Sequence, residues 1–299
     1  MDFHSFRILV RVAELGSFSQ AAERLFLTQP AVSKRVAALE SELGIRLFDR
    51  LDRQVRLTEA GRALLPHAYR LLQELADLRR SIDNLEGTIA GTLAMGTSHH
   101  IGLHRLPPVL KAFSRRYPQV HLDIRFMDSE SACRSVEQGI LELGVVTLPP
   151  AALPNLQIAP LWEDPLHFVV SKDHRLADSP SPSLEELVRY PAVLPAPATY
   201  TRELLERVLR ERALELRVGM TTNYLETLKM LAVTGLGWAL LPGTMLDDNL
   251  KSLNLPGIGL ARHLGLVTHA RHTLSNAARA MVQTCVDHAD RESGATLGE

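Results

Sequence analysis

The chain has 299 residues, of which 45% are hydrophobic, and its formal net charge is −1 at pH 7. This length suggests about two or three domains with sizeable cores. The longest apolar runs, such as 228–242, are shorter than the roughly 20 residues that span a bilayer, and no basic segment followed by a hydrophobic one opens the sequence. Cys133 and Cys285 lie far apart and form no CxxC pair. We therefore expect a cytoplasmic protein with no membrane partner and no cysteine metal site.

Two short helices are predicted near the N-terminus. Residues 18–25 follow Ser17, a favoured N-cap residue, and Thr28 can cap a second helix whose first turn accepts Pro30. The apolar positions of the second helix recur at spacings of 4, 3 and 4, which predicts a buried stripe: Val32, Val36, Leu39 and Leu43. The outward face then carries small polar and basic residues. Two helices with such a face fit a helix-turn-helix, and a plain helical hairpin with a solvated face fits the same pattern.

A β-hairpin, or wing, is predicted after Gly44. Two short extended runs flank the turn 51–53, and three arginines gather there: Arg50, Arg53 and Arg56. Residues 1–62 hold ten Lys and Arg against eight Asp and Glu. That excess is small, so phosphate binding depends on whether these charges share one face.

The segments SFSQAAERL, TQPAVSKRVAALESELGIRLFDR and VRLTEAG resemble the DNA-binding domain of LysR-type transcriptional regulators. The resemblance implies a winged helix-turn-helix in residues 1–60, whose second helix meets base edges while the wing arginines approach the adjacent groove or phosphates. The candidate DNA-binding residues are Ser19, Gln20, Thr28, Gln29, Pro30, Ser33, Lys34, Arg35, Arg50 and Arg53.

A long helix is predicted to begin at Thr58 and Glu59 and to continue into the linker segment, residues 61–90. Its apolar residues keep a 3.5-residue period: Leu64, Ala68, Leu71, Leu75, Leu78, Ile82 and Leu85. About three heptads are marginal alone, so we expect this seam to dimerise the chain together with other contacts. The alternative is that the seam packs on its own domain. In the family this helix joins two DNA-binding domains, which suits a pseudo-symmetric DNA site.

Strands and helices alternate from Gly91 onward, which predicts parallel sheets with helical crossovers. The expected strands are 92–96, 120–126, 144–148, 167–171, 192–195, 238–241 and 263–269. This pattern resembles the two-lobed, periplasmic-binding-protein-like effector domain of the same family. The expected fold is therefore α/β, with an effector-binding domain at 91–295 in which lobe I is 91–160 and 266–295 and lobe II is 161–265.

The junctions between strands and helices are the expected ligand site. In such folds ligands bind at the carboxyl ends of strands and at helix N-termini, whose free N–H groups favour anions. The candidate effector-binding residues are Thr97, Ser98, His99, His100, Asp128, Ser129, Thr147, Ala198, Thr199, Thr201, Arg202 and Asn223. Each hydroxyl taken alone is equally well explained as a helix cap. Their convergence favours a small, anionic metabolite.

Catalytic and metal motifs are incomplete in this sequence. His100 and His104 have the i, i+4 spacing of a metal pair, but no adjacent glutamate forms HExxH, so we expect surface histidines and no metal site. The run 96–100 lacks the final glycine of GxSxG, and 235–237 lacks the third glycine of GxGxxG. We expect no catalytic residues and no cofactor.

The sequence therefore predicts a ligand-responsive transcription factor rather than an enzyme. The expected partners are promoter DNA with an imperfect inverted repeat, the chain itself as homodimer or homotetramer, and RNA polymerase. An enzyme with an added DNA-binding domain is a competing hypothesis, disfavoured because no nucleophile–base pair is evident. An architectural DNA protein without an effector is a third, and the polar strand ends count against it.

Overall fold

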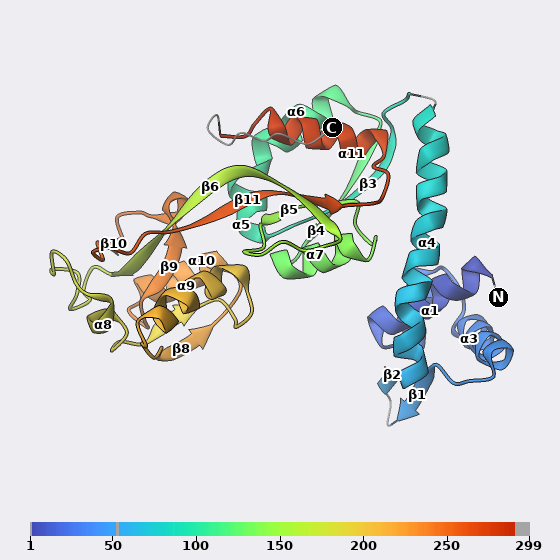
Figure 1. Cartoon of the computed structure of the whole chain (residues 1–299), viewed down its shortest axis with the longest axis horizontal. Coiled ribbons are helices and arrows are strands. Elements are labelled where there is room, and N and C mark those ends of the chain that lie inside the picture. Colours follow the sequence, from blue (N-terminus) through green and yellow to red (C-terminus); the bar gives the residue numbers. More distant parts are fainter. Residues whose placement is uncertain (1, 52–53, 86, 291–299) are drawn as a thin grey trace. The chain divides into compact units, whose positions relative to one another are not determined.

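A computed structural model of the chain describes residues 2–51, 54–85 and 87–290. The chain divides into two compact units, Met1–Glu86 and Gly87–Glu299. The elements of the first unit are α1 (Phe3–Leu15), α2 (Phe18–Arg24), α3 (Gln29–Leu43), β1 (Phe48–Leu51), β2 (Gln54–Leu57) and α4 (Glu59–Leu85) (Figure 1).

Side-chain caps set where the first three helices begin. Asp2 accepts a hydrogen bond from the Ser5 amide at 2.7 Å and starts α1. Ser17 and Thr28 cap α2 and α3, which confirms both predicted caps. The predicted stripe on α3 is also confirmed, because Val32, Val36 and Leu39 are all buried in the core of this unit. Burying this stripe fixes the opposite face of α3 toward solvent.

The wing is attached to α3 by a carboxylate. Gly44, with a φ of 70°, ends α3 in the left-handed conformation that glycine adopts without strain. Glu40 Oε1 then accepts from the amides of Leu47 at 2.7 Å and Phe48 at 3.2 Å. The antiparallel pairing of β1 with β2 confirms the predicted hairpin, whose turn residues 52–53 lie outside the described residues.

Helix α4 uses its two ends differently. Thr58 Oγ1 accepts from the Gly61 amide at 3.0 Å, so it caps the helix as predicted. Two members of the predicted seam, Leu64 and Ala68, pack in the core of the first unit, so for them the self-packing alternative is correct. Farther along, the side chains of Leu78 and Ile82 are 58% and 57% exposed. None of the helices in the described ranges is both long enough and apolar enough to cross a membrane.

The second unit contains a mixed set of strands and helices. Its first half holds β3 (Gly91–Thr97), α5 (His99–His104), α6 (Leu106–Arg116), β4 (Val120–Phe126), α7 (Ser129–Glu137), β5 (Leu143–Thr147) and β6 (Leu156–Ser171). Its second half holds α8 (Leu184–Leu187), β7 (Ala192–Leu194), α9 (Tyr200–Glu211), β8 (Val218–Thr221), α10 (Leu225–Val233), β9 (Ala239–Pro242), the 3-10 turn η1 (Gly243–Met245), β10 (Leu250–Leu253), β11 (Leu260–His269) and α11 (Asn276–Val286).

A seven-stranded sheet organises this unit, in the order β10-β6-β11-β5-β3-β4, with β9 also paired to β6. Strands β6 and β11 pair antiparallel over ten positions and form a twisted ribbon that runs through the whole unit (Figure 1). A separate core lies toward each end of the ribbon. We call lobe I the part around Phe113 and Met281, and lobe II the part around Leu205 and Trp238.

The structure corrects the expectation of purely parallel sheets. β3 pairs parallel with β4 and β5, and β7 pairs parallel with β8, but both partners of β11 are antiparallel to it. The predicted strand 167–171 is only the end of the 16-residue β6. Pro160 and Pro165 interrupt the strand pattern in the sequence, because proline cannot donate to a ladder, and so hide the first part of β6.

The pairing of β6 with β11 has an irregularity at Gly265, where the register shifts between Leu264 and Gly265. A Cβ built on Gly265 would lie 2.2 Å from the Ala159 carbonyl oxygen. We predict that Gly265→Ala destabilises the protein by about 1–3 kcal/mol, because the ribbon must shift to relieve the overlap. Urea unfolding would measure this loss. Gly259→Ala is the matched control, since nothing lies within 4 Å of its added Cβ; equal losses would contradict the steric explanation.

Candidate DNA-binding face and ligand cavity

The first turns of α3 present the candidate base-reading residues. Gln29, Pro30 and Lys34 are exposed and Ser33 is half-buried. Gln29 Nε2 donates to Ser33 Oγ at 2.9 Å, so the amide and the hydroxyl form one polar pair on this face. Amide and hydroxyl groups of this kind can donate to and accept from base edges, while the lysine can contact a guanine edge or a phosphate.

The remaining candidate DNA-binding residues have different surroundings. Ser19 and Gln20 are exposed on α2, and Thr28 caps α3. The Arg35 guanidinium forms an ion pair with Asp2 at 2.8 Å and so links α3 to the start of α1. Arg53 lies outside the described residues, as does the side chain of Arg50.

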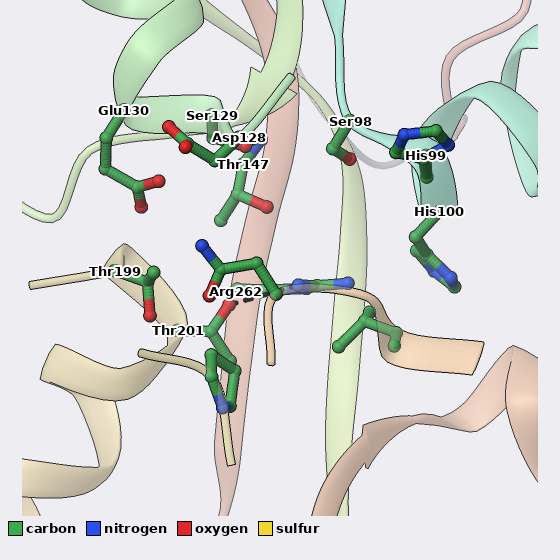
Figure 2. Close-up of a pocket in the computed structure, with 13 residues that line it drawn as sticks. Ser98, His99, His100, Asp128, Ser129, Glu130, Thr147, Thr199, Thr201 and Arg262 are labelled. Carbon is green, nitrogen blue, oxygen red and sulfur yellow. Dashed lines mark hydrogen bonds between the residues drawn. The ribbon is translucent and has the colours of Figure 1, made fainter. Parts of the chain in front are cut away.

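In the second unit, a cavity of about 480 Å³, its open mouth included, lies where lobe I and lobe II meet. Parallel strands from both lobes end there: β3, β4 and β5 from lobe I, and β7 and β8 from lobe II. Helices α5, α7, α9 and α10 begin at the same place. Its lining residues are Ser98, His99, His100, Asp128, Ser129, Glu130, Thr147, Pro195, Thr199, Thr201, Asn223, Leu225 and Arg262 (Figure 2).

Nine of the twelve candidate effector-binding residues line this cavity. The three others lie beside it. Thr97 is fully buried at the end of β3, and Ala198 is exposed in a turn with a φ of 64°. The Arg202 guanidinium is held by Glu206 Oε1 at 2.7 Å, so its charge is engaged along α9. Arg202 is the candidate arginine from the sequence, whereas the arginine that lines the cavity is Arg262.

Arg262 belongs to a buried network at the crossing of the two lobes. It stands directly opposite Asp164 in the β6–β11 ribbon, and its Nε donates to Asp164 Oδ2 at 2.7 Å. Its Nη1 donates to Thr201 Oγ1, in lobe II, at 3.0 Å. Arg105 from lobe I approaches the other oxygen of Asp164 at 3.8 Å. Because both members of the central pair are almost fully buried, their charges are weakly screened and depend on these partners.

A second contact joins the lobes at Glu130. Its Oε1 accepts from the Tyr200 amide, the first residue of α9, at 2.6 Å. This carboxylate therefore occupies a helix N-terminus, where the free N–H groups and the helix dipole favour negative charge. Burial raises the pKa of Glu130 despite that hydrogen bond. The site thus already accommodates one carboxylate oxygen of the protein itself.

Three groups meet at the edge of the cavity: His100, His104 and Glu226. The expectation that both histidines lie at the surface is wrong for His100, which is only 3% exposed. Burial, followed by the nearby charges of Arg262 and His104, lowers the pKa of His100 to about 3. His104 Nε2 lies 3.6 Å from Glu226 Oε1, which comes from the start of α10. The sequence did not suggest this glutamate because it lies in a distant helix of the other lobe.

Comparison with known proteins agrees with both halves of this architecture. Residues 3–62 match the bacterial regulatory helix-turn-helix proteins of the lysR family, and residues 86–290 match the LysR substrate binding domain. The chain belongs to the LysR family of transcriptional regulators. It is accordingly a DNA-binding regulator with an effector-binding domain, not an enzyme.

Individual relatives cover different shares of this regulator. An HTH-type transcriptional regulator of Azotobacter vinelandii is 67% identical over 108 residues, which is 36% of this chain and 75% of that protein. A probable RuBisCO transcriptional regulator of Cyanophora paradoxa is 30% identical over 91% of this chain and 87% of its own. The crystal structure of full-length CbnR with its target DNA superposes with a TM-score of 0.63 at 20% identity, covering 97% of this chain and all of that one.

Four lining residues were absent from the sequence-based candidates: Glu130, Pro195, Leu225 and Arg262. Glu130, Pro195 and Leu225 are at most three residues from candidates that were named, so extending each junction by a turn would have included them. Arg262 gave no such signal. It lies inside a strand, at no junction with a helix, and reaches the cavity only because β11 crosses between the lobes.

Substitutions on the exposed face of α3 test whether its side chains read bases. We predict that Ser33→Ala and Lys34→Ala each weaken discrimination between selected and scrambled DNA by about 1–3 kcal/mol, if the side chain contacts a base edge. Folding should be unaffected, because the buried stripe is untouched. DNA selected from a random pool by the wild-type protein serves as the specific probe in a fluorescence anisotropy titration.

Ser41→Ala is the matched control, since Ser41 is exposed in the last turn of the same helix. If Lys34 contacts only phosphate, its substitution lowers the affinity for both DNAs equally. It also reduces the slope of log affinity against log salt concentration by about one. Unchanged discrimination in both variants would remove these two side chains from the base-reading role.

Proposed function

We propose that this regulator binds an imperfect inverted repeat in promoter DNA as a dimer or tetramer and responds to a small anionic metabolite. In this proposal residues 1–60 bind DNA, residues 61–90 dimerise, and residues 91–295 bind the effector between lobe I and lobe II. RNA polymerase is the proposed downstream partner, and the cytoplasm the proposed location.

The observation that carries the anionic effector is the set of groups that converge on the cavity. The guanidinium of Arg262 and the N-termini of four helices supply positive potential. Serine and threonine hydroxyls from both lobes supply neutral donors and acceptors around it. Of the two lining carboxylates, Asp128 accepts from the Ser131 amide at 2.6 Å and Glu130 accepts from Tyr200. Both are therefore engaged with the protein, and this arrangement favours a ligand carboxylate near Arg262.

The contact between Glu130 and Tyr200 supports a mechanism of response. An incoming carboxylate would compete with Glu130 for the N-terminus of α9, and this competition would alter a hydrogen bond that joins the lobes. A ligand shifts such an equilibrium only by its differential affinity for the two lobe arrangements, commonly worth about 1–3 kcal/mol. Effector binding in this proposal therefore biases the arrangement of the lobes by a graded amount.

The exposed half of α4 supports the dimer. Leu71, Leu78, Ile82 and Leu85 lie on one stripe and are at least 43% exposed in the single chain. Large apolar side chains gathered on one helix face stabilise a protein when a second surface removes them from water. A second copy of α4 presents the same stripe, which makes it a self-complementary partner.

A screen of metabolites tests the effector proposal. Carboxylic acids should raise the melting temperature, and their uncharged amides should not. A ligand present at 100 times its Kd adds about 2.7 kcal/mol of stability. Equal stabilisation by acids and amides would refute the anionic class.

The best carboxylate from that screen then tests the cavity. Thr147→Val removes a lining hydroxyl with little change of shape, and we predict that it weakens binding by about 1.5–3 kcal/mol, roughly 10–100-fold, if that hydroxyl contacts the carboxylate. Thr268→Val is the matched control, because Thr268 is also buried on a strand but does not line this cavity. Isothermal titration calorimetry measures both, and full affinity in Thr147→Val would exclude that hydroxyl as a contact.

For the dimer, we predict that Leu78→Asp together with Ile82→Asp dissociates a fragment spanning residues 1–90, because the charges enter an apolar interface. The monomer should stay folded, since both side chains are exposed in the single chain. Sedimentation velocity measures the association and circular dichroism the fold. Ser81→Asp adds a charge at an exposed position beside the stripe and serves as control. A dimer that survives the double substitution would place the interface elsewhere.

A further inference from the structure

His100 is buried without a hydrogen-bonding partner among the described residues. The side chain is 3% exposed, and neither ring nitrogen has a hydrogen bond within residues 2–51, 54–85 and 87–290. A neutral imidazole carries one donor and one acceptor, and leaving buried polar atoms unpaired costs stability. Buried polar atoms without a partner point to a function that needs them free or to an ion that completes them. The ring nitrogens of His100 therefore indicate that a further group binds at this place in the protein.

Two further ligand groups face the same point. His104 lies one helical turn after His100 on α5, and their ring centroids are 4.6 Å apart. Glu226 approaches from the first turn of α10, and its Oε1, 3.6 Å from His104 Nε2, is buried and has no hydrogen bond to any part of the chain that the structure describes. One ligand atom from each of the three residues lies within 4.8 Å of the others. The triad thus combines two imidazoles from lobe I with one carboxylate from lobe II.

The spacing of these atoms is close to that of a four-coordinate metal ion. Zn²⁺ holds nitrogen and oxygen ligands at about 2.0–2.2 Å, so tetrahedral ligands lie roughly 3.4 Å apart. The widest pair must therefore close by at most about 1.4 Å. His104 and Glu226 have partly exposed side chains, which can make this adjustment by rotation. Three protein ligands leave a fourth position for water or another ligand, as in open zinc sites.

We propose that His100, His104 and Glu226 form a binding site for a divalent transition-metal ion, such as Zn²⁺, that bridges lobe I and lobe II. Two imidazoles and one carboxylate suit borderline metals such as Zn²⁺, Co²⁺ and Ni²⁺ better than Mg²⁺ or Ca²⁺. The charge of Glu226 offsets part of the repulsion from the nearby arginines. Because His100 also lines the ligand cavity, the metal would lie at the edge of that cavity.

Metal binding would fix the contact between α5 and α10. In the structure these helices meet through the His104–Glu226 pair at 3.6 Å, which is a weak contact between partly exposed side chains. Coordination bonds would replace it and favour the lobe arrangement that holds the three ligands together. This inference goes beyond the proposed function, since it requires neither an anionic effector nor DNA.

The test measures Zn²⁺ binding to the full chain, freed of metal with a chelator, by equilibrium dialysis and isothermal titration calorimetry. The expected result is one Zn²⁺ per chain. Glu226→Gln and His104→Gln should each lower the affinity at least about tenfold, because each removes one of three ligands. Co²⁺ supplies a spectroscopic readout, since four-coordinate Co²⁺ absorbs visible light strongly and octahedral aqueous Co²⁺ does so weakly.

A second histidine pair supplies the control. The rings of His269 and His272 stack at 3.5 Å on the same unit, so His269→Gln tests adventitious binding to neighbouring histidines. It should leave the stoichiometry and affinity unchanged. The proposal is overturned if the wild-type chain binds no Zn²⁺, if Glu226→Gln and His104→Gln bind it as well as wild type, or if His269→Gln alone removes it. Melting curves of the metal-free variants show that each remains folded.

Discussion

The ion pair between Asp164 and Arg262 is the constraint on which the second unit depends. The two residues face each other across the only strands, among those described, that run through both lobes. Both are nearly fully buried, so removing one partner would leave an uncompensated charge, which typically costs about 3–5 kcal/mol. The pair also extends into each lobe, through Arg105 on one side and Thr201 on the other. It therefore fixes the ribbon, both lobes and the positive charge of the cavity in a single network.

In the first unit, the contacts of helix α3 have a comparable role. Its buried stripe determines which side faces solvent, and Glu40 on the same helix holds the amides where the wing begins. Helix α3 thus positions both its own exposed face and the wing, and residues that contact DNA together must keep a common register. Helix α4 has a divided role: Ala68 completes this core, while Leu78 and Ile82 lie outside it. The single heptad stripe is therefore buried in the core of the first unit near the start of the helix and exposed farther along.

Local features of this protein could be predicted from sequence, and long-range ones could not. Ser17 and Thr28 set helix starts through contacts within three residues, so the sequence alone identified them. The junction rule located most of the cavity, because strand ends of a parallel sheet meet at one edge. The β6–β11 ribbon was not predicted, because prolines masked the first part of β6. The pairing that brings Arg262 to the cavity was therefore not predicted either. The role of Glu226 could not be predicted either, because only tertiary packing sets α10 against α5.

The contacts between the lobes explain why a small ligand can have a large effect here. The ribbon is continuous, so the lobes can move relative to one another only by twisting β6 and β11, and the buried ion pair resists that motion near the cavity. Two weaker polar contacts lie around it, Glu130 with Tyr200 and His104 with Glu226. Glu130 accepts one amide hydrogen bond across the lobes, and the His104–Glu226 pair is loose at 3.6 Å, whereas the buried pair has partners in both lobes. A ligand that exchanges one such contact for its own therefore changes the balance between lobe arrangements by an amount comparable to the contact it replaces, while the network around Asp164 keeps the cavity assembled.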